Sequence, residues 1–255
     1  MNRYALKIEY DGTHFHGWQK QKNLITVQGS INSAVEKTIG NRSDVVGAGR
    51  TDTGVHAIGQ VAHLDIKSSW PPKKLENAIN YHIKPNAINI NDVKLVDENF
   101  HARFSAIKRY YVYRIFIKQS SLTFDKNLFW RIRRPLNIDK MKEAASHLIG
   151  THDFTTFRSS MCQSHSPIKT LDKIQFSTWK NDRGTIIEIQ LEARSFLHNQ
   201  VRSIVGTLHK VGEQKLTPAD IKIALLSRNR QNCGPVAPPR GLYLKKIDYK
   251  TDLFT

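Results

Sequence analysis

The stretch Gly47 to Ala57, GAGRTDTGVHA, places a single carboxylate among glycines and threonines. Asp52 is that carboxylate, and Arg50 stands two residues before it. An unpaired, ionised Asp can act as a nucleophile toward a sugar or an electron-poor ring, and a nearby arginine favours the ionised form. The same residue types also suit a turn in which the carboxylate caps its own backbone. Local sequence alone favours the turn.

Other kinds of site do not fit the residues around this loop. The dinucleotide-binding fingerprint needs a glycine where Asp52 stands, and no phosphate-loop lysine follows. The next acid, Asp65, falls in a predicted strand, so no carboxylate pair for hydrolysis is present. His14 and His16 form an HxH pair without a further ligand nearby, and the two cysteines lack metal-site spacing. We therefore predict no metal site.

The charge of the chain points to a polyanionic partner. The 255 residues include 39 lysines and arginines against 22 acids, a net charge of +17, and 39% are hydrophobic. This composition is typical of a soluble globular protein, and RNA or DNA is the commonest partner of so basic a surface. A generally basic proteome is the alternative explanation. No helix-turn-helix or zinc-finger pattern supports DNA binding.

Hydropathy and cysteine content predict where the protein works. The N-terminal residues MNRYALKIEY contain no long apolar run, so we expect neither a signal peptide nor a membrane span. Two cysteines are too few for a disulfide framework, which favours a reducing compartment. The expected location is the cytoplasm.

The elements that must position the loop follow from periodicity. Residues 3–10 alternate as a half-buried strand, Thr26 can cap a helix that Gly40 ends, and Pro71-Pro72 opens a second helix. Further strands are predicted at 45–46, 59–66 and 88–96. In the second part we predict a strand over 111–117, a helix over 138–149, a hairpin of 173–179 with 186–193, helices over 196–211 and from Pro218, and a strand at 242–249.

These elements predict an α+β fold made of two related halves, 1–105 and 106–255. Each half is expected to form an antiparallel sheet with helices on one face. The first helix of each half ends in Ile-Gly, and an Asp and then an Arg follow within about a dozen residues. The loop that carries Asp52 falls in the N-terminal half.

Several blocks of the chain resemble the tRNA pseudouridine synthase A family. GAGRTDTGVHA resembles the active-site motif of that family, and YDGTHFHGWQKQ resembles its N-terminal segment. Further blocks match in order across nearly the whole chain: FHARFSA with the R-x-Y-x-Y pattern that follows it, GTHDFTTFR, SPIKTL, FLHNQVRSIVGTL and APPRGLYL. The number and order of these blocks make coincidence an inadequate explanation.

The resemblance implies both the reaction and the fold. The family isomerises uridine to pseudouridine in the tRNA anticodon stem-loop, at tRNA positions 38, 39 and 40, without a metal or organic cofactor. The two halves would then form one pseudouridine-synthase-type catalytic unit with a central cleft. Asp52 matches the catalytic nucleophile, and the sequence leaves open whether it attacks C6 of the base or acts at the sugar. A target base inside a stem must first be flipped out, at a cost of roughly a few kcal/mol.

The resemblance assigns four further residues to RNA binding. Tyr111, chosen over Tyr110 by the R-x-Y-x-Y spacing, would stack on the displaced uracil. Arg202 would keep Asp52 ionised, although Gln200 stands where many relatives have Met. Arg50 would contact phosphate or fill the gap that the flipped base leaves. Leu242 would line the uracil pocket, and core packing accounts for it equally well.

The resemblance also implies partners: a tRNA anticodon arm and a second copy of the chain in a homodimer, with no membrane and no DNA. Two alternatives remain. One is a non-catalytic tRNA-binding protein or chaperone, which the presence of Asp52, Tyr111 and Arg202 disfavours. The other is a pseudouridine synthase for a different RNA site, because target choice depends on surface shape and charge.

Overall fold

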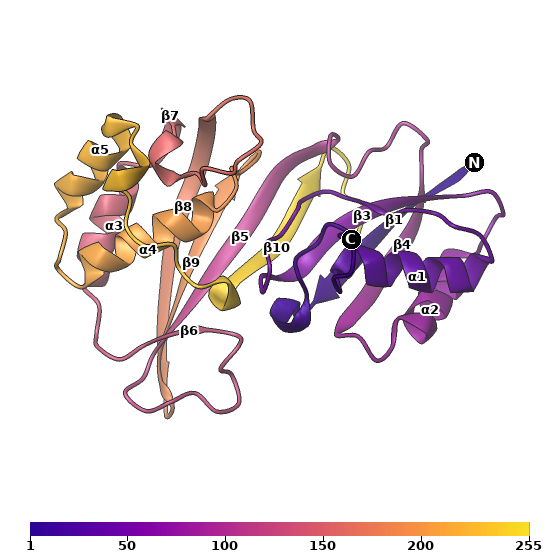
Figure 1. The fold of residues 1–255 in the computed structure, drawn as a ribbon, viewed down its shortest axis with the longest axis horizontal. Helices are drawn as coiled ribbons and strands as arrows, with labels where there is room; N and C mark the ends of the chain where they lie inside the picture. The colour runs from indigo at the N-terminus through magenta and orange to yellow at the C-terminus, as the bar shows by residue number, and fades with distance from the viewer. Residues whose placement is uncertain (255) are drawn as a thin grey trace. The chain divides into compact units, whose positions relative to one another are not determined.

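The computed structural model describes residues 1–254 and divides the chain into two compact units (Figure 1). The first unit contains Met1–Arg109 together with the chain from Tyr243 onward, and the second contains Tyr110–Leu242. The sequence boundary was expected between residues 105 and 106, with the last strand in the second half. From Tyr243 onward the last strand instead belongs to the first unit, in which it pairs with a strand of that unit.

The sheet of the first unit has the strand order β4 (Ile88–Val96), β1 (Asn2–Tyr10), β3 (His56–Ile66) and β10 (Leu242–Tyr249). β1 runs antiparallel to both β3 and β4, and the short β2 (Val46–Gly47) also pairs antiparallel with β3. β10 pairs in parallel with β3, an exception to the antiparallel sheet that the sequence predicts.

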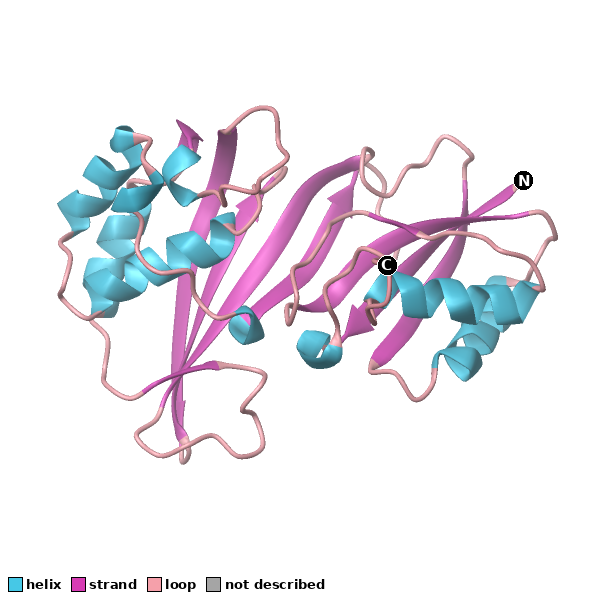
Figure 2. Ribbon diagram, viewed as in Figure 1, coloured by secondary structure: helices cyan, strands magenta, loops and turns pink. Residues whose placement is uncertain are grey.

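Two helices cover one face of this sheet (Figure 2). α1 (Val27–Ile39) begins where Thr26 Oγ1 accepts the Gly29 N–H at 3.2 Å and ends at Gly40, whose φ of 73° suits glycine. α2 (Pro72–Ile83) begins at the predicted prolines. The helices bury apolar residues at helical spacing: Val27, Ile31 and Val35 from α1, and Leu75, Ile79 and Ile83 from α2.

The sheet of the second unit has the order β5 (Ala106–Ile117), β9 (Gly184–Ala193), β8 (Ile168–Asn181) and β7 (Gly150–Asp153). β5 starts within the last residues of the first unit. β8 and β9 form the predicted hairpin, and both are longer than predicted. The short β6 (Trp130–Ile132) pairs in parallel with β5 and was not predicted.

Three helices lie over one face of the second sheet (Figure 2): α3 (Ile138–Ser146), α4 (Gln200–Gly212) and α5 (Pro218–Ser227). α4 begins four residues later than expected because the Gln200 side chain accepts the Leu197 N–H at 2.8 Å and Asn199 has a φ of 63°. Within residues 1–254 there are also four short 3-10 helices: η1 (Gly12–His14), η2 (Thr155–Phe157), η3 (Arg230–Asn232) and η4 (Pro239–Gly241). The predicted α+β class is confirmed.

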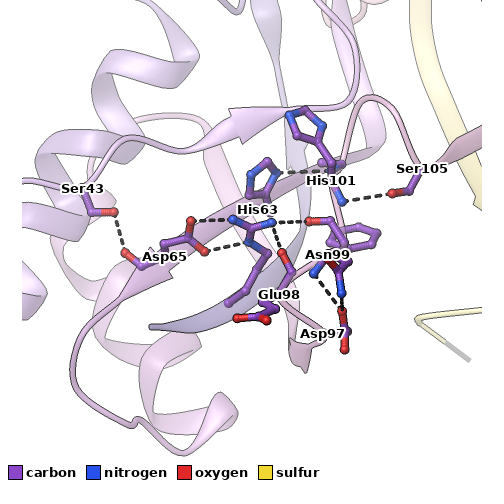
Figure 3. A network of polar contacts seen from close by, with 11 residues as sticks. Ser43, His63, Asp65, Asp97, Glu98, Asn99, His101 and Ser105 are labelled. Carbon is purple, nitrogen blue, oxygen red and sulfur yellow. Dashed lines mark hydrogen bonds and ion pairs between the residues drawn. The ribbon is translucent and has the colours of Figure 1, made fainter.

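A polar network holds the part of the chain that connects β4 to β5 (Figure 3). Arg3 on β1 donates two hydrogen bonds of 2.7 Å to Asp65 on β3, and it also donates to the carbonyls of Glu98 and Phe100. His63 Nδ1 accepts the N–H of Ala102 at 3.2 Å, and burial lowers the pKa of His63 to about 4. The segment that precedes β5 is thereby attached to β1 and β3.

None of the helices within residues 1–254 is both long and apolar enough to cross a bilayer.

Candidate active site

The Asp52 loop, which we define as Gly47–Ala57, connects β2 to β3 in the first unit. The strand pairing continues one step past β2, where the Ala48 N–H donates to the Val61 carbonyl at 2.8 Å. The next residue, Gly49, is held by a side chain: Gln60 Nε2 donates to its carbonyl at 2.7 Å, and Gln60 Oε1 accepts its N–H at 3.3 Å. Gln60 is completely buried.

A buried arginine holds the same end of the loop. Arg109 Nη2 donates to the carbonyls of Ala48 and Arg103, each at 2.8 Å. The Arg109 side chain is only 8% exposed. A charge-assisted bond in such a site is stronger than a neutral one, so the backbone that enters the loop has little freedom.

The backbone next to Asp52 is fixed on both sides. Before it, Thr51 is buried, its hydroxyl bonds that of Tyr10 at 2.8 Å, and its carbonyl accepts the Trp18 N–H at 3.0 Å. After it, the Asp52 carbonyl accepts the Val55 N–H at 3.1 Å in a turn. The Asp52 side chain is half-buried, whereas Arg50 is exposed. The loop therefore contains a turn at Asp52, and the Asp52 side chain remains partly exposed.

Two glycines of the N-terminal motif allow the chain to approach the loop. A Cβ on Gly12 would lie 2.0 Å from the Val55 carbonyl oxygen, and one on Gly17 would lie 2.7 Å from that of Thr51. Gly17 also has a φ of +81°, a conformation that other residues rarely adopt. The segment YDGTHFHGW thus forms the support on which the Asp52 loop rests.

Tyr111 lies in the second unit, on β5. Its side chain is buried, and its ring meets that of Phe196 edge-to-face, with centroids 5.2 Å apart. Tyr113, two residues further along β5, is completely buried and donates its hydroxyl to the Pro238 carbonyl at 2.7 Å. Burial raises the pKa of Tyr113 above its ordinary value.

Arg202 and Leu242 also lie in the second unit. Arg202, in the first turn of α4, donates through Nε to the Ala237 carbonyl and through Nη1 to Asn199 Oδ1, both at 2.8 Å. Leu242 is buried at the start of β10, directly after η4. The structure thus places Asp52 and Arg50 on one loop of the first unit, and Tyr111 and Arg202 on β5 and α4 in the second; Leu242, the first residue of β10, is the last residue of the second unit.

Sequence reasoning missed the residues that support the loop. Gln60 and Arg109 act on backbone carbonyls through side chains, and such pairings leave no periodic pattern in the sequence. Gln60 could have been noticed as a polar residue in a strand that is otherwise mostly apolar. The HxH pair stays exposed, and within residues 1–254 no three His, Cys, Asp or Glu side chains gather in a group that could hold a metal ion.

Comparisons with known proteins identify relatives along the whole chain. A family model described as tRNA pseudouridine synthase matches residues 7–105 and 144–250. The chain is similar to two proteins named tRNA pseudouridine synthase A. The one from Dinoroseobacter shibae is 50% identical over 254 residues, which cover 100% of this chain and 99% of the relative. The one from Ruegeria sp. is 47% identical over 255 residues, which cover 100% of this chain and 98% of the relative. A third, from Allorhizobium ampelinum, is 50% identical over 254 residues, 99% of this chain and 96% of the relative.

A solved structure titled as a Cbf5-Nop10-Gar1 complex matches with a TM-score of 0.31 and 12% identity, over 80% of this chain and 53% of that chain. That likeness is too remote to support a statement about function. The family model and the full-length relatives are sufficient: this chain belongs to the tRNA pseudouridine synthase family.

Proposed function

We propose that this isomerase converts uridine to pseudouridine at positions 38, 39 and 40 of the tRNA anticodon stem-loop, with Asp52 as its nucleophile. Membership of the family establishes that the protein makes pseudouridine in tRNA. The choice of uridines and the roles of individual residues are the proposal.

The reaction is an isomerisation, so the composition of the nucleotide does not change. The N1–C1′ glycosidic bond breaks, the uracil turns, and its C5 forms a new bond to C1′. The hydrogen on C5 leaves to water, and N1 regains a proton. No oxidant or reductant is consumed, so the protein must supply a nucleophile, a site for the flipped base and a route for the proton.

The construction of the Asp52 loop is the observation that carries this proposal. Hydrogen bonds hold Thr51 before the acid and the Asp52 carbonyl after it, so the carboxylate is presented from a fixed backbone. Catalytic groups held in their productive position avoid the entropy cost of finding it during the reaction. A carboxylate that only capped its own turn would not require a support built from a separate segment of chain.

The proposed roles of the other residues rest on the resemblance and on local contacts. Phe196 fixes the plane of the Tyr111 ring, which suits a ring that stacks on uracil, worth roughly 1–3 kcal/mol per base. Hydrogen bonds from Arg202 to the Ala237 carbonyl and to Asn199 help to fix the direction of its guanidinium, as required of a group that keeps a carboxylate ionised. Arg50, exposed on the loop, would contact the RNA backbone, and Leu242 would contact the base.

The net charge of +17 supports tRNA as the partner, since a basic surface attracts a polyanion from a distance. We further propose that the protein acts in the cytoplasm as a homodimer, as the resemblance implies.

The test uses tRNA transcripts with uridine at position 38, 39 or 40 and tritium on C5 of uracil. Tritium release to water is measured for the parent, Asp52→Ala and Asp52→Asn, and tRNA binding by filter retention is measured in parallel. Asp92→Asn is the control, because it removes a half-buried carboxylate from β4 of the same unit. We expect release by the parent and the control, none by either Asp52 variant, and similar binding by all.

Other outcomes identify the alternatives. Release by the Asp52 variants at the parental rate would refute the role of Asp52. Binding without release by any protein would favour a non-catalytic tRNA-binding protein, and release only from uridines outside the three positions would favour a different RNA site.

A further inference from the structure

The side-chain amide of Gln60 makes several buried hydrogen bonds to backbone groups, and the proposed reaction assigns no role to this residue. Its side-chain amide is completely buried, accepts the N–H groups of Gly49 and Val61 at 3.3 and 3.2 Å, and donates to the Gly49 carbonyl at 2.7 Å. A buried amide with this many partners is costly to disturb, because the backbone groups it serves would lose their hydrogen bonds without regaining water.

The strand register explains why a side chain is needed at this point. β2 pairs with β3 through Val46 with His63 and Gly47 with Ala62, and the Ala48 N–H extends the ladder to Val61. Continuing this register places Gly49 opposite Gln60. At such a position a regular antiparallel ladder makes no backbone hydrogen bonds between the two strands, and the Gln60 side-chain amide instead bonds both backbone groups of Gly49 by offering one donor and one acceptor.

The hydrogen bonds from the Gln60 side chain to Gly49 fix the position at which the loop leaves β2. Gly49 lies three residues before Asp52, and the residue between Gly49 and the buried Thr51 is the exposed Arg50. Thr51 is held by Tyr10 and Trp18, and Gly49 by Gln60, so the segment that carries Asp52 is anchored on opposite sides of Arg50.

We propose that Gln60 is a positioning residue: its side-chain amide extends the β2–β3 ladder to Gly49 and thereby sets the position of the Asp52 carboxylate. The inference rests on the proposed role of Asp52. A displacement of about 1 Å at a reacting group can lower a rate by roughly 100-fold. Loss of the Gln60 amide is therefore expected to lower kcat by about 10- to 100-fold while the affinity for tRNA changes less than about twofold.

Asn80 offers a matched control within the same unit. Its amide makes the same pair of backbone bonds, donating to the Ile90 carbonyl and accepting the Ile90 N–H, both at 2.8 Å. These bonds join α2 to β4, on elements that do not carry the Asp52 loop. Gln60→Leu and Asn80→Leu each remove such a clamp, so both variants are expected to lose stability, and Gln60→Leu alone is expected to lose kcat as well.

A second variant keeps the test valid if Gln60→Leu folds poorly. In Gln60→Glu the carboxyl group is buried, which raises its pKa, and its protonated form can still donate to the Gly49 carbonyl. We expect the kcat of Gln60→Glu to approach the parental value at low pH and to fall below it as the pH rises. A purely structural glutamine would not give this activity profile in protein that remains folded across the range.

The experiment measures kcat under single-turnover conditions, tRNA affinity and thermal unfolding for the parent, Gln60→Leu, Gln60→Glu, Asn80→Leu and Asp52→Asn. A loss of kcat in the Gln60 variants, with none in folded Asn80→Leu, is the expected result. Parental kcat in folded Gln60→Leu, or an equal loss in Asn80→Leu, would overturn the inference. Full activity of Asp52→Asn would instead refute the role of Asp52, so the two failures are distinguishable.

Discussion

Gly17 lies against the Asp52 loop. Replacing Gly17 with alanine, and comparing the result with alanine at Gly40, separates the strain of a left-handed backbone from the displacement of the loop by the added Cβ. Gly17 has a φ of +81°, and a Cβ added to it would lie 2.7 Å from the Thr51 carbonyl oxygen. Gly40 has a similar φ of +73°, but a Cβ there would meet nothing within 4 Å. Gly40→Ala therefore measures the cost of the left-handed conformation, and Gly17→Ala measures that cost plus the displacement of Thr51.

The expected magnitudes follow from these two terms. Forcing alanine into the left-handed region costs roughly 1–2 kcal/mol. At Gly17 the Thr51 carbonyl must also move, which costs about 1–3 kcal/mol more as overpacking and strains its bond from the Trp18 N–H. With about 2–4 °C of Tm lost per kcal/mol, we expect Gly40→Ala to lower the Tm by about 2–8 °C and Gly17→Ala by about 4–20 °C.

Activity distinguishes the two variants more sharply than stability. Because Thr51 directly precedes Asp52, Gly17→Ala is expected to lower kcat by at least about tenfold at a temperature where the protein is folded. Gly40→Ala, at the end of α1, is expected to leave kcat unchanged. Thermal unfolding and single-turnover tritium release provide the measurements. Equal kcat in the two folded variants would refute the reasoning that Thr51 transmits the displacement to Asp52.

Three further predictions concern pH, packing and salt. The pKa of His63 is about 4 in the folded protein and about 6.5 when unfolded, so the unfolded chain binds more protons between these values. Stability is then full above about pH 6.5 and falls by about 3 kcal/mol toward pH 4. His63→Asn, which keeps an acceptor for the Ala102 N–H, should lose this part of the pH dependence in chemical denaturation, and an identical pH dependence would contradict the assignment. Gly206→Ala would place a Cβ 1.7 Å from the Pro235 carbonyl oxygen and should lower the Tm by roughly 5 °C or more, whereas an unchanged Tm would show that α4 can shift. Affinity for tRNA should fall at least about tenfold between roughly 50 and 200 mM salt in filter binding, and an affinity indifferent to salt would show that the basic surface is not the RNA contact.

The sequence by itself determined the elements whose ends carry local signals. Thr26 and Gly40 mark the ends of α1, the prolines mark the start of α2, and alternation marks β1 and the hairpin of β8 with β9. These signals act within a few residues along the chain, so they can be interpreted without a fold. The family, too, follows from short motifs in order.

Tertiary structure decided what supports the chemistry. Gln60 and Gly49 are eleven residues apart, and Arg109 lies 61 residues from the Ala48 carbonyl that it holds. β10 joins the first unit through a parallel pairing with β3 that no local pattern encodes. A hydrogen bond between distant residues depends on where the whole chain brings them, because donor and acceptor types are common along any sequence. The acid could be found in its motif, whereas the groups that hold its loop became visible only in the folded chain.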